Sequence, residues 1–350
     1  MVKRFKNIEY CKGVALLLVM VYHYWVLSGS PPINLYGFRM FVFLGGEFGV
    51  TLFFVLSGFG IYCLLEKEKG RINWGTFIKS RIKKIAPMYY FSIFLIIALT
   101  PGGGAYFSKS GLPDIVMHIL FMHNLSGRFS GSINGALWTM GIIFQFYLIA
   151  LFLYKCLKKN KNITVLICIF LTIAIKFIVY KYLMPAFGLS GTQYFIYGRQ
   201  LPTALDNFVL GMYAAAIVCE SKKILSIGKG TLYIIVTMGF VMLWGSIGFR
   251  KGVYVANPLG YTWHSLLAVF FAITVVIIGK IKEMEKRGIL YTIGKNEYGI
   301  YLLHFPILQN LLQTPLVQYF NTKGYYVLGC LIFVSISLGI GYIFNKKFHF

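Results

Sequence analysis

The chain has 350 residues, of which 58% are hydrophobic and only 13% are charged, and its mean hydropathy is +0.71. This composition excludes an ordinary soluble domain and predicts an integral membrane protein. The formal net charge is +24, but the basic residues fall in short clusters between apolar runs, a pattern that orients membrane proteins and argues against nucleic-acid binding. The six cysteines show no metal-ligand spacing, so no metal site is predicted.

Ten apolar runs recur along the chain, each near the length that crosses a bilayer. They are Gly13–Ser28, Gly45–Leu65, Ile85–Leu99, Asn134–Tyr154, Ile163–Leu183, Leu201–Cys219, Thr231–Gly248, Tyr261–Gly279, Tyr298–Leu312 and Tyr325–Phe344. The sequence therefore predicts an all-α integral membrane protein with about ten transmembrane helices, in which residues 1–350 form a single domain.

Clusters of Lys and Arg precede the first run and follow the second, fourth, sixth, eighth and tenth runs. All of these positions lie on one side of the membrane if every run crosses it. The positive-inside rule then predicts that both termini are cytoplasmic, in a multi-pass protein of the plasma membrane. One further apolar segment, Asp114–Leu125, is too short to cross, and we expect it to be interfacial or re-entrant on the outer face.

His23 lies in the middle of the first apolar run. An ionisable side chain there costs roughly 2 to 3 kcal/mol on insertion scales for charged residues, so it is seldom accidental. Lys12 lies eleven residues earlier, which is about three helical turns, so both side chains project from one helix face about 16 Å apart. This face is predicted to carry a cation at the membrane surface and a proton acceptor inside the membrane.

Other charged residues have a structural and a functional interpretation. Glu47 lies near the outer end of the second span, where a carboxylate needs a partner or water. Asp206 and Arg199 flank the outer end of the sixth span, and the simplest expectation is that they pair with each other. Arg81 and Lys84 share a helix face at i and i+3. They either anchor the topology or bind the phosphates of a polyanionic donor that arrives from the cytoplasm.

The fourth and ninth spans add polar and aromatic candidates. Trp138 and Gln145 share a face of the fourth span, and Tyr301 and His304 recur at helical spacing in the ninth. His304 lies about as far from the cytoplasmic edge as His23, so the two histidines could line one cavity. The alternative is that His304 only packs between helices.

Several segments, taken in order, resemble the acyltransferase-3 family of membrane acyltransferases. They are Ile8-Glu9-Tyr10-Cys11-Lys12-Gly13 with Tyr22-His23, Gly49-Val50 with Phe53 to Phe59, Arg81 to Pro87, Trp138 to Tyr147, and Ile293-Gly294-Lys295 with Tyr301-Leu302-Leu303-His304. The resemblance runs from about Lys6 to Pro306. It implies a ten-helix membrane fold that moves an acyl group, usually acetyl, from a cytoplasmic acyl-CoA to a hydroxyl of a surface carbohydrate.

The resemblance also implies roles for single residues. Lys12 and His23 match the family's recurrent pair of a basic residue and a transmembrane histidine, and Arg81 and Lys84 match its Arg-x-x-Arg pattern. The chain departs from the family pattern at three places. Ile143 and Phe144 stand where many members have an acidic pair, Thr51 stands where an Asp is frequent, and Glu297 replaces a Ser. We expect no appended extracellular domain, so the membrane domain is expected to complete the transfer.

The chemistry of the residues agrees with this implication. A sugar hydroxyl is a weak nucleophile at neutral pH, and imidazole is the side chain whose ordinary pKa, about 6.5, best suits a general base. We expect His23 to be the catalytic base, or the nucleophile of a covalent acyl-histidine mechanism. Its possible partners are Glu47 and Asp206. The residues expected to bind donor phosphates are Lys12, Arg81 and Lys84, and those expected to contact substrate are Trp138, Gln145, Tyr301 and His304.

The sequence thus predicts a membrane O-acyltransferase that uses acetyl-CoA or another acyl-CoA as co-substrate and holds no permanently bound cofactor. Its expected acceptor is a cell-envelope or exported carbohydrate. The alternative from another class is a carrier or flippase for a glycolipid or glycan subunit, in which His23 and His304 relay protons. The acceptor sugar, the acyl length, the choice between O- and N-transfer and the oligomeric state stay open.

Overall fold

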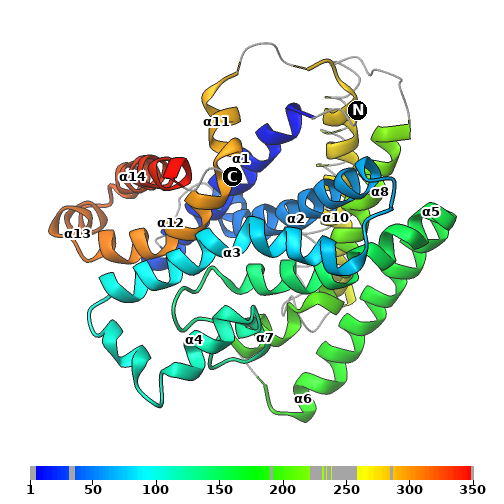
Figure 1. Ribbon diagram of the computed structural model, residues 1–350. Coiled ribbons are helices and arrows are strands. Elements are labelled where there is room, and N and C mark those ends of the chain that lie inside the picture. Colours follow the sequence, from blue (N-terminus) through cyan, green and yellow to red (C-terminus); the bar gives the residue numbers. More distant parts are fainter. Residues whose placement is uncertain are drawn as a thin grey trace.

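The computed structural model describes residues 5–30, 36–189, 192–220, 258–283 and 287–347, together with Thr231, Ile234 and Met238. Within these ranges the chain forms helices and turns but no strand (Figure 1). The longer helices are α1 (Asn7–Leu27), α2 (Tyr36–Lys67), α3 (Trp74–Leu99), α5 (Trp138–Ile178), α8 (Leu201–Glu220), α10 (Pro258–Lys280), α12 (Glu297–Leu312) and α14 (Tyr326–Lys347). The shorter ones are η1 (Gly103–Phe107), α4 (Leu112–Ile119), η2 (His123–Leu125), η3 (Val179–Leu183), α6 (Met184–Ala186), α7 (Thr192–Gly198), α11 (Ile289–Lys295) and α13 (Pro315–Thr322).

Seven of the described helices are long and apolar enough to cross a membrane. They are Asn7–Leu27, Gly45–Lys67, Trp74–Leu99, Trp138–Ala186, Leu201–Glu220, Thr262–Lys280 and Tyr326–Lys347. The predicted class is therefore confirmed: the protein is all-helical and of the multi-pass membrane type.

The structure thus has three fewer candidate spans among its described residues than the ten that were predicted. The predicted fourth and fifth spans lie together in the segment Trp138–Ala186, which has 49 residues and would be about 74 Å long as one straight helix. Asn160 interrupts it with φ −154° and ψ 96°, and its Oδ1 accepts the N–H of Ile163 at 3.0 Å, as an N-cap does. Figure 1 shows the second half of α5 running on to α6. The break therefore divides α5 into two helices.

The other two predicted spans are not counted for different reasons. The predicted seventh span, Thr231–Gly248, lies outside the described residues except at three positions. The predicted ninth span corresponds to α12, whose 16 residues extend only about 24 Å, less than the roughly 30 Å of a bilayer core.

Helix α3 begins earlier than the predicted third span, at Trp74 instead of Ile85. Asn73 caps it, because its Oδ1 accepts the N–H of Thr76 at 2.8 Å. Pro87 consequently lies inside the helix, and Arg81 and Lys84 lie on α3 itself.

The centre of the molecule is formed by α2, which packs against α1 and α8. A Cβ atom at Gly58 would lie 2.0 Å from the carbonyl oxygen of Phe208, and one at Gly211 would lie 1.9 Å from that of Val55. Only glycine permits so close a contact between the two backbones. The core beside this crossing contains a stack in which Phe208 lies between Phe54 and Phe146, with ring centroids 4.8 and 4.1 Å apart.

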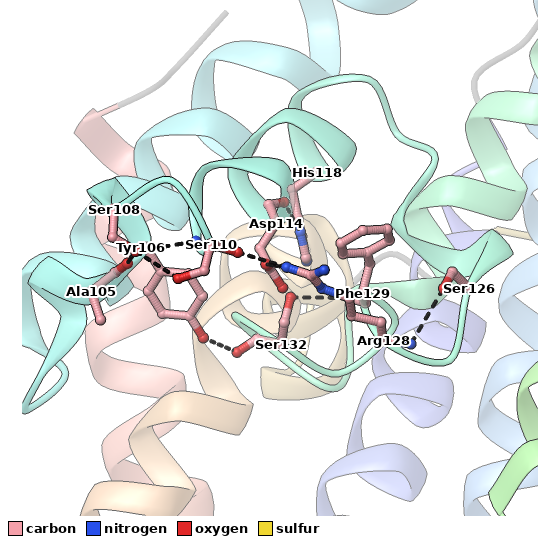
Figure 2. Close-up of polar contacts among 11 residues, drawn as sticks. Ala105, Tyr106, Ser108, Ser110, Asp114, His118, Ser126, Arg128, Phe129 and Ser132 are labelled. Atoms are coloured by element: carbon pink, nitrogen blue, oxygen red, sulfur yellow. Dashed lines mark hydrogen bonds and ion pairs between the residues drawn. The ribbon is translucent and has the colours of Figure 1, made fainter.

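The segment between α3 and α5 folds back on itself (Figure 2). Arg128 donates to the carbonyl oxygen of Ser110 at 2.6 Å and lies 3.5 Å from a carboxylate oxygen of Asp114. The hydroxyl of Tyr106 donates to the carbonyl oxygen of Ser132. These bonds join the first and last parts of the segment into one unit.

The predicted re-entrant segment Asp114–Leu125 belongs to this unit and contains α4 and η2. Asn124 of η2 accepts a hydrogen bond from Gln145 of α5 at 3.1 Å and donates one to Gln200 at 2.8 Å. Gln145 lies two turns inside α5, so the segment is held against that helix. Its interfacial or re-entrant position stays a prediction.

His118 and His123 stack in the same segment with ring centroids 4.1 Å apart. Both are fully buried, and each contacts a backbone carbonyl oxygen, that of Asp114 for His118 and that of Leu137 for His123. Burial lowers the pKa of both imidazoles, that of His123 to about 3. The unfolded chain binds a proton near pH 6.5 and folded His123 only near pH 3, so the protein loses stability as the pH falls between these values.

We therefore expect His123 alone to lower the free energy of unfolding by about 2 kcal/mol between pH 7 and pH 5. His123→Gln retains a donor for the Leu137 carbonyl and removes the titrating group. The Tm of the purified variant should consequently fall less than that of the wild type between pH 7 and pH 5. An equal fall in both proteins would contradict this account.

Candidate active site

His23 of α1 and His304 of α12 lie side by side, and we call them the histidine pair. Nδ1 of His23 is 2.9 Å from Nε2 of His304, and the rings stack with centroids 5.1 Å apart. His304 is fully buried, whereas His23 is half-buried. Phe305 lies edge-on against His23 at 5.2 Å between centroids. The structure thus brings together two histidines that the sequence placed at similar depths.

The hydrogen bonds of the histidine pair determine which nitrogen of His23 is free. Nδ1 of His304 lies 2.6 Å from the carbonyl oxygen of Tyr301, and because a carbonyl only accepts, this nitrogen carries a proton. Nε2 of a neutral His304 is then an acceptor for Nδ1–H of His23. Nε2 of His23 keeps its lone pair and makes no hydrogen bond to any described residue. A general base or a nucleophile needs this arrangement.

A proline and an asparagine fix the turn of α12 that carries His304. Pro306 has no N–H, so the carbonyl oxygen of Leu302 lacks its usual helical partner. Nδ2 of Asn134, in the turn before α5, donates to that oxygen at 3.1 Å. Asn134 is itself buried. Helix α12 is therefore tied to the start of α5 beside His304.

Two glycines bring the start of α12 against α1. A Cβ atom at Gly294 would lie 1.7 Å from the carbonyl oxygen of Glu9, and one at Gly13 would lie 2.5 Å from that of Leu290. Because neither position has a Cβ atom, α11 packs directly on α1. Helix α12 follows immediately after α11 and begins with Glu297, which thereby lies beside α1.

A cavity of about 180 Å³ lies among α2, α3, α5 and α12, and we call it the donor cavity. Lys84 and Glu297 line its lysine-rich end, and Thr139 and Tyr301 line its inner end. The hydroxyl of Tyr301 lies 2.7 Å from Oγ1 of Thr139. The ring of Tyr301 lies 5.2 Å from that of His304. The cavity therefore leads from a charged mouth to the ring that adjoins the histidine pair.

The three cations predicted to bind donor phosphates have different surroundings. Lys12 is held by Glu9 at 3.1 Å and by Glu297 at 3.4 Å. Lys84 is exposed at the mouth of the donor cavity, and Arg81 lies one turn before it. Among the described residues, no carboxylate lies within 4 Å of Arg81 or Lys84. These two side chains are therefore better placed than Lys12 to bind an anion.

Glu47 and Asp206, the predicted partners of the catalytic base, make contacts away from the histidine pair. The carboxylate of Glu47 accepts hydrogen bonds from Arg199 and from Nε2 of His264, the latter at 2.8 Å. Asp206 lies 3.9 Å from Nζ of Lys176. The expected pair between Arg199 and Asp206 is therefore wrong, because each side chain has a different partner.

Lys176 and His264 were not among the predicted site residues. Both lie inside apolar runs, and the side chain of Lys176 is only 4% exposed. An ionisable residue inside a span was the signal that singled out His23, and the same signal applies to both of these residues.

Trp138 and Gln145 were predicted to act from one helix face, but they contact different parts of the protein. Gln145 bonds to Asn124, as described above. Trp138 lines a second cavity, of about 40 Å³, among α2, α5, α8 and α10, where the guanidinium of Arg199 lies 5.9 Å from its ring. We call this space the second cavity.

Comparison with known proteins identifies the family of the chain. The chain matches the acyltransferase domain family over residues 5–342. The O-acetyl transferase of Shigella phage Sf6 is 24% identical over 325 residues, which cover 86% of this chain and 84% of that protein. A protein of Acidianus two-tailed virus that is named as an acetyltransferase is 23% identical over 347 residues, which cover 97% and 90%.

A protein of Staphylococcus aureus (strain COL) that is named as an O-acetyltransferase is 24% identical over 378 residues, which cover 96% of this chain and 56% of that protein. No solved structure matches the chain. The family match extends over nearly the whole chain and confirms the resemblance that the sequence motifs indicate. The protein therefore belongs to the acyltransferase-3 family.

Proposed function

We propose that the protein is a plasma-membrane O-acyltransferase that moves an acetyl group from cytoplasmic acetyl-CoA to a hydroxyl of a cell-envelope or exported carbohydrate. The observation that carries the proposal is the lone pair on Nε2 of His23. It belongs to a histidine pair in which the ring of His304 lies 5.2 Å from that of Tyr301, at the inner end of the donor cavity. The names of the relatives support acetyl as the group and oxygen as the acceptor atom. The family likeness supports a carbohydrate acceptor.

The donor enters this scheme from the lysine-rich end. Lys84 and Arg81 bind the phosphates of CoA, because both are free of carboxylate partners within the described structure. Lys12 contributes a third positive charge in the adjoining wall. Glu297 and His304 are seven residues apart on α12, or about 10 Å along the helix axis. The pantetheine arm covers this distance along the donor cavity.

The transfer then needs one base and one proton transfer path. As the acceptor oxygen attacks the carbonyl carbon of the thioester, Nε2 of His23 takes the hydroxyl proton. The new C–O bond forms, the C–S bond breaks, and the imidazolium returns the proton to the sulfur of CoA. In the covalent variant Nε2 attacks first and CoA leaves as the thiolate. The acceptor hydroxyl then takes the acetyl group from the imidazole, and its proton passes to the thiolate. Both routes yield an acetyl ester and CoA with a free thiol.

Purified protein tests the proposal directly. In detergent, it should turn over acetyl-CoA to CoA thiol only when acceptor carbohydrate is present. Mass spectrometry of surface glycans should show one added acetyl mass in cells that contain the protein. A carrier would leave the thioester intact and would need a gradient instead. Absence of both acetyl transfer and the added mass would refute the proposed function.

We also propose ten crossings with both termini in the cytoplasm, in which α11 and α12 together make the ninth, since only Asn296 lies between them. The turn at Asn160 supports this topology, because four lysines gather around it. They are Lys155, Lys158, Lys159 and Lys161.

Cysteine labelling in intact cells measures this topology. In a background without native cysteines, a membrane-impermeant thiol reagent should modify Lys109→Cys but not Lys158→Cys, because the first lies between α3 and α5 and the second in the lysine cluster. Labelling of both positions after permeabilisation is the control. Labelling of Lys158→Cys but not of Lys109→Cys in intact cells would show that the orientation is the opposite of the one proposed.

The donor site yields a kinetic prediction. The double variant Arg81→Ala, Lys84→Ala should raise the KM for acetyl-CoA by about tenfold or more with little change in kcat, because phosphate contacts are equal in the ground and transition states. Lys83→Ala is the matched control, since Lys83 is an exposed lysine of the same helix that does not line the donor cavity. An unchanged KM in the double variant would leave both residues as topology anchors.

A further inference from the structure

Five ionisable side chains gather around the second cavity, within helices long enough to span the membrane and the turn before α8. They form two groups, Glu47 with Arg199 and His264, and Lys176 with Asp206. Two carboxylates balance the two permanent cations, so the cluster has no net charge when the imidazole is neutral. Such a cluster favours a neutral, hydrogen-bonding ligand over an anion such as CoA.

Two buried side chains, Lys176 of this cluster and the neighbouring Asn207, have hydrogen-bonding capacity left over. Asn207 lines the second cavity and is 5% exposed, and its Oδ1 has no hydrogen-bond partner among the described residues. Lys176 also lines the cavity and donates to Ser265 at 3.2 Å, which uses one of its three protons. Helix packing alone does not require such groups, since an unpaired buried acceptor costs about 1 to 3 kcal/mol. Two residues of the cavity lining therefore retain hydrogen-bonding capacity, one as an acceptor and one as a donor.

The size and lining of the second cavity narrow the choice of ligand. A volume of about 40 Å³ holds about three water-sized groups, which excludes an acyl chain or a nucleotide and suits the hydroxyl groups along one edge of a sugar. Trp138 and Tyr180 add aromatic rings to the polar lining. Flat rings beside hydrogen-bonding side chains suit a ligand that has both C–H and O–H groups.

The second cavity lies directly across a helix contact from the donor cavity. On α5, Trp138 lines the second cavity and the next residue, Thr139, lines the donor cavity. On α2, Phe54 lines the second cavity and Phe53 lines the donor cavity. The rings of Phe54 and Trp138 meet at 6.3 Å between centroids. Consecutive residues of α2 and of α5 thus line the two cavities, and we call this contact between the two helices the seam.

The second cavity is also close to the histidine pair. A Cβ atom at Gly46 would lie 2.5 Å from the ring of Tyr22. Tyr22 precedes His23 in α1, and Gly46 precedes Glu47 in α2. The Glu47 end of the cavity is therefore next to the turn of α1 that carries His23.

We propose that the second cavity binds hydroxyl groups of the carbohydrate acceptor, next to the hydroxyl that is acylated. The proposal rests on the proposed acetyl transfer. It assigns acceptor recognition to α2, α5, α8 and α10, with Asn207 and Lys176 as contacts for the sugar, and donor binding to the opposite side of the seam. Donor and acceptor then reach the histidine pair from different cavities.

Two measurements on one set of variants test this assignment. The first is the initial rate at which radioactive acetyl label enters the alkali-labile esters of envelope glycan in cells. The second is the Kd of the detergent-purified protein for acetyl-CoA. Asn207→Leu keeps the branching of the side chain but is larger, and it removes the whole amide, whose Oδ1 is unpaired. The Tm of the variant reports whether it folds. Ser337→Ala is the matched control, because Ser337 is equally buried with an unpartnered Oγ but lies on α14, away from both cavities.

We expect Asn207→Leu to lower the labelling rate by about tenfold, with the Kd for acetyl-CoA and the Tm close to those of the wild type, and Ser337→Ala to change none of the three. Lys176→Met should lower the rate in the same way. Wild-type labelling rates in Asn207→Leu and Lys176→Met would overturn the acceptor site and leave the proposed function intact. A parallel loss of acetyl-CoA affinity would also overturn it, because the cavity would then serve the donor. If the wild type adds no acetyl label, the proposed function itself fails.

Discussion

Replacing His23 by asparagine should reduce the kcat of acetyl transfer by about 10² to 10⁴-fold, the range for loss of a general base. The asparagine amide places an N–H donor near the position of Nδ1, so the hydrogen bond to Nε2 of His304 can persist, but the variant has no basic nitrogen. The protein should therefore stay folded and keep its affinity for acetyl-CoA. Steady-state kinetics and thermal melting of the detergent-purified variant measure both expectations.

Two further variants separate chemistry from structure. His23→Ala leaves Nε2 of His304 without its donor, so it should lose a similar amount of activity and about 1 to 3 kcal/mol of stability as well. Lys12→Ala changes the same helix face, but it should act mainly on the KM for acetyl-CoA. Normal turnover in His23→Asn would remove His23 from the chemistry and make His304 the next candidate.

The sequence indicated both members of the histidine pair, His23 from its place inside an apolar run and His304 from its similar depth, although His304 could equally have served helix packing alone. His23 stands out because ionisable side chains are rare inside spans, and its spacing from Lys12 follows from helix geometry. Its hydrogen bond to His304 was beyond prediction, since it joins residues 281 positions apart. The bond depends on the contact of Gly294 with α1 and on the Asn134 bond to α12, and neither can be derived from local periodicity.

Local patterns were also weaker guides to helix ends than to helix existence. The third span was predicted from its apolar residues alone, whereas the helix starts at the Asn73 cap, three turns before the apolar run. This shift matters for the donor site. It puts Arg81 and Lys84 on a helix beside the donor cavity. The sequence alone did not decide whether they anchor the topology or bind phosphate.

For charged residues inside spans, the sequence shows that a partner is needed but not which residue the partner is. The sequence indicates that Glu47 and Asp206 need partners, but partner choice depends on which helices meet. Glu47 bonds to His264 of α10 and Asp206 lies near Lys176 of α5. The resulting cluster lies around the second cavity. Glu47 and Asp206, which the sequence assigned to the same site as His23, are therefore separate from the histidine pair.

The second large effect should come from His304, which acts through His23 and not on the substrate. Its Nε2 holds His23 in the tautomer whose Nε2 is unprotonated, as the carbonyl of Tyr301 determines. His304→Leu removes this acceptor, so His23 can place its proton on Nε2 and lose the lone pair that faces the reaction. One buried hydrogen bond of this kind is worth about 1 to 3 kcal/mol, so we expect kcat to fall by about 10- to 100-fold.

A conservative variant distinguishes this positioning role from a merely structural one. His304→Gln offers an amide oxygen near the position of Nε2, which can accept the proton of His23 Nδ1, so it should recover most of the kcat that His304→Leu loses. The KM for acetyl-CoA should stay constant in both variants, because neither changes the mouth of the donor cavity. If the glutamine variant is as slow as the leucine variant while both melt at the wild-type temperature, His304 itself takes part in the chemistry, and control of the His23 tautomer is not its function.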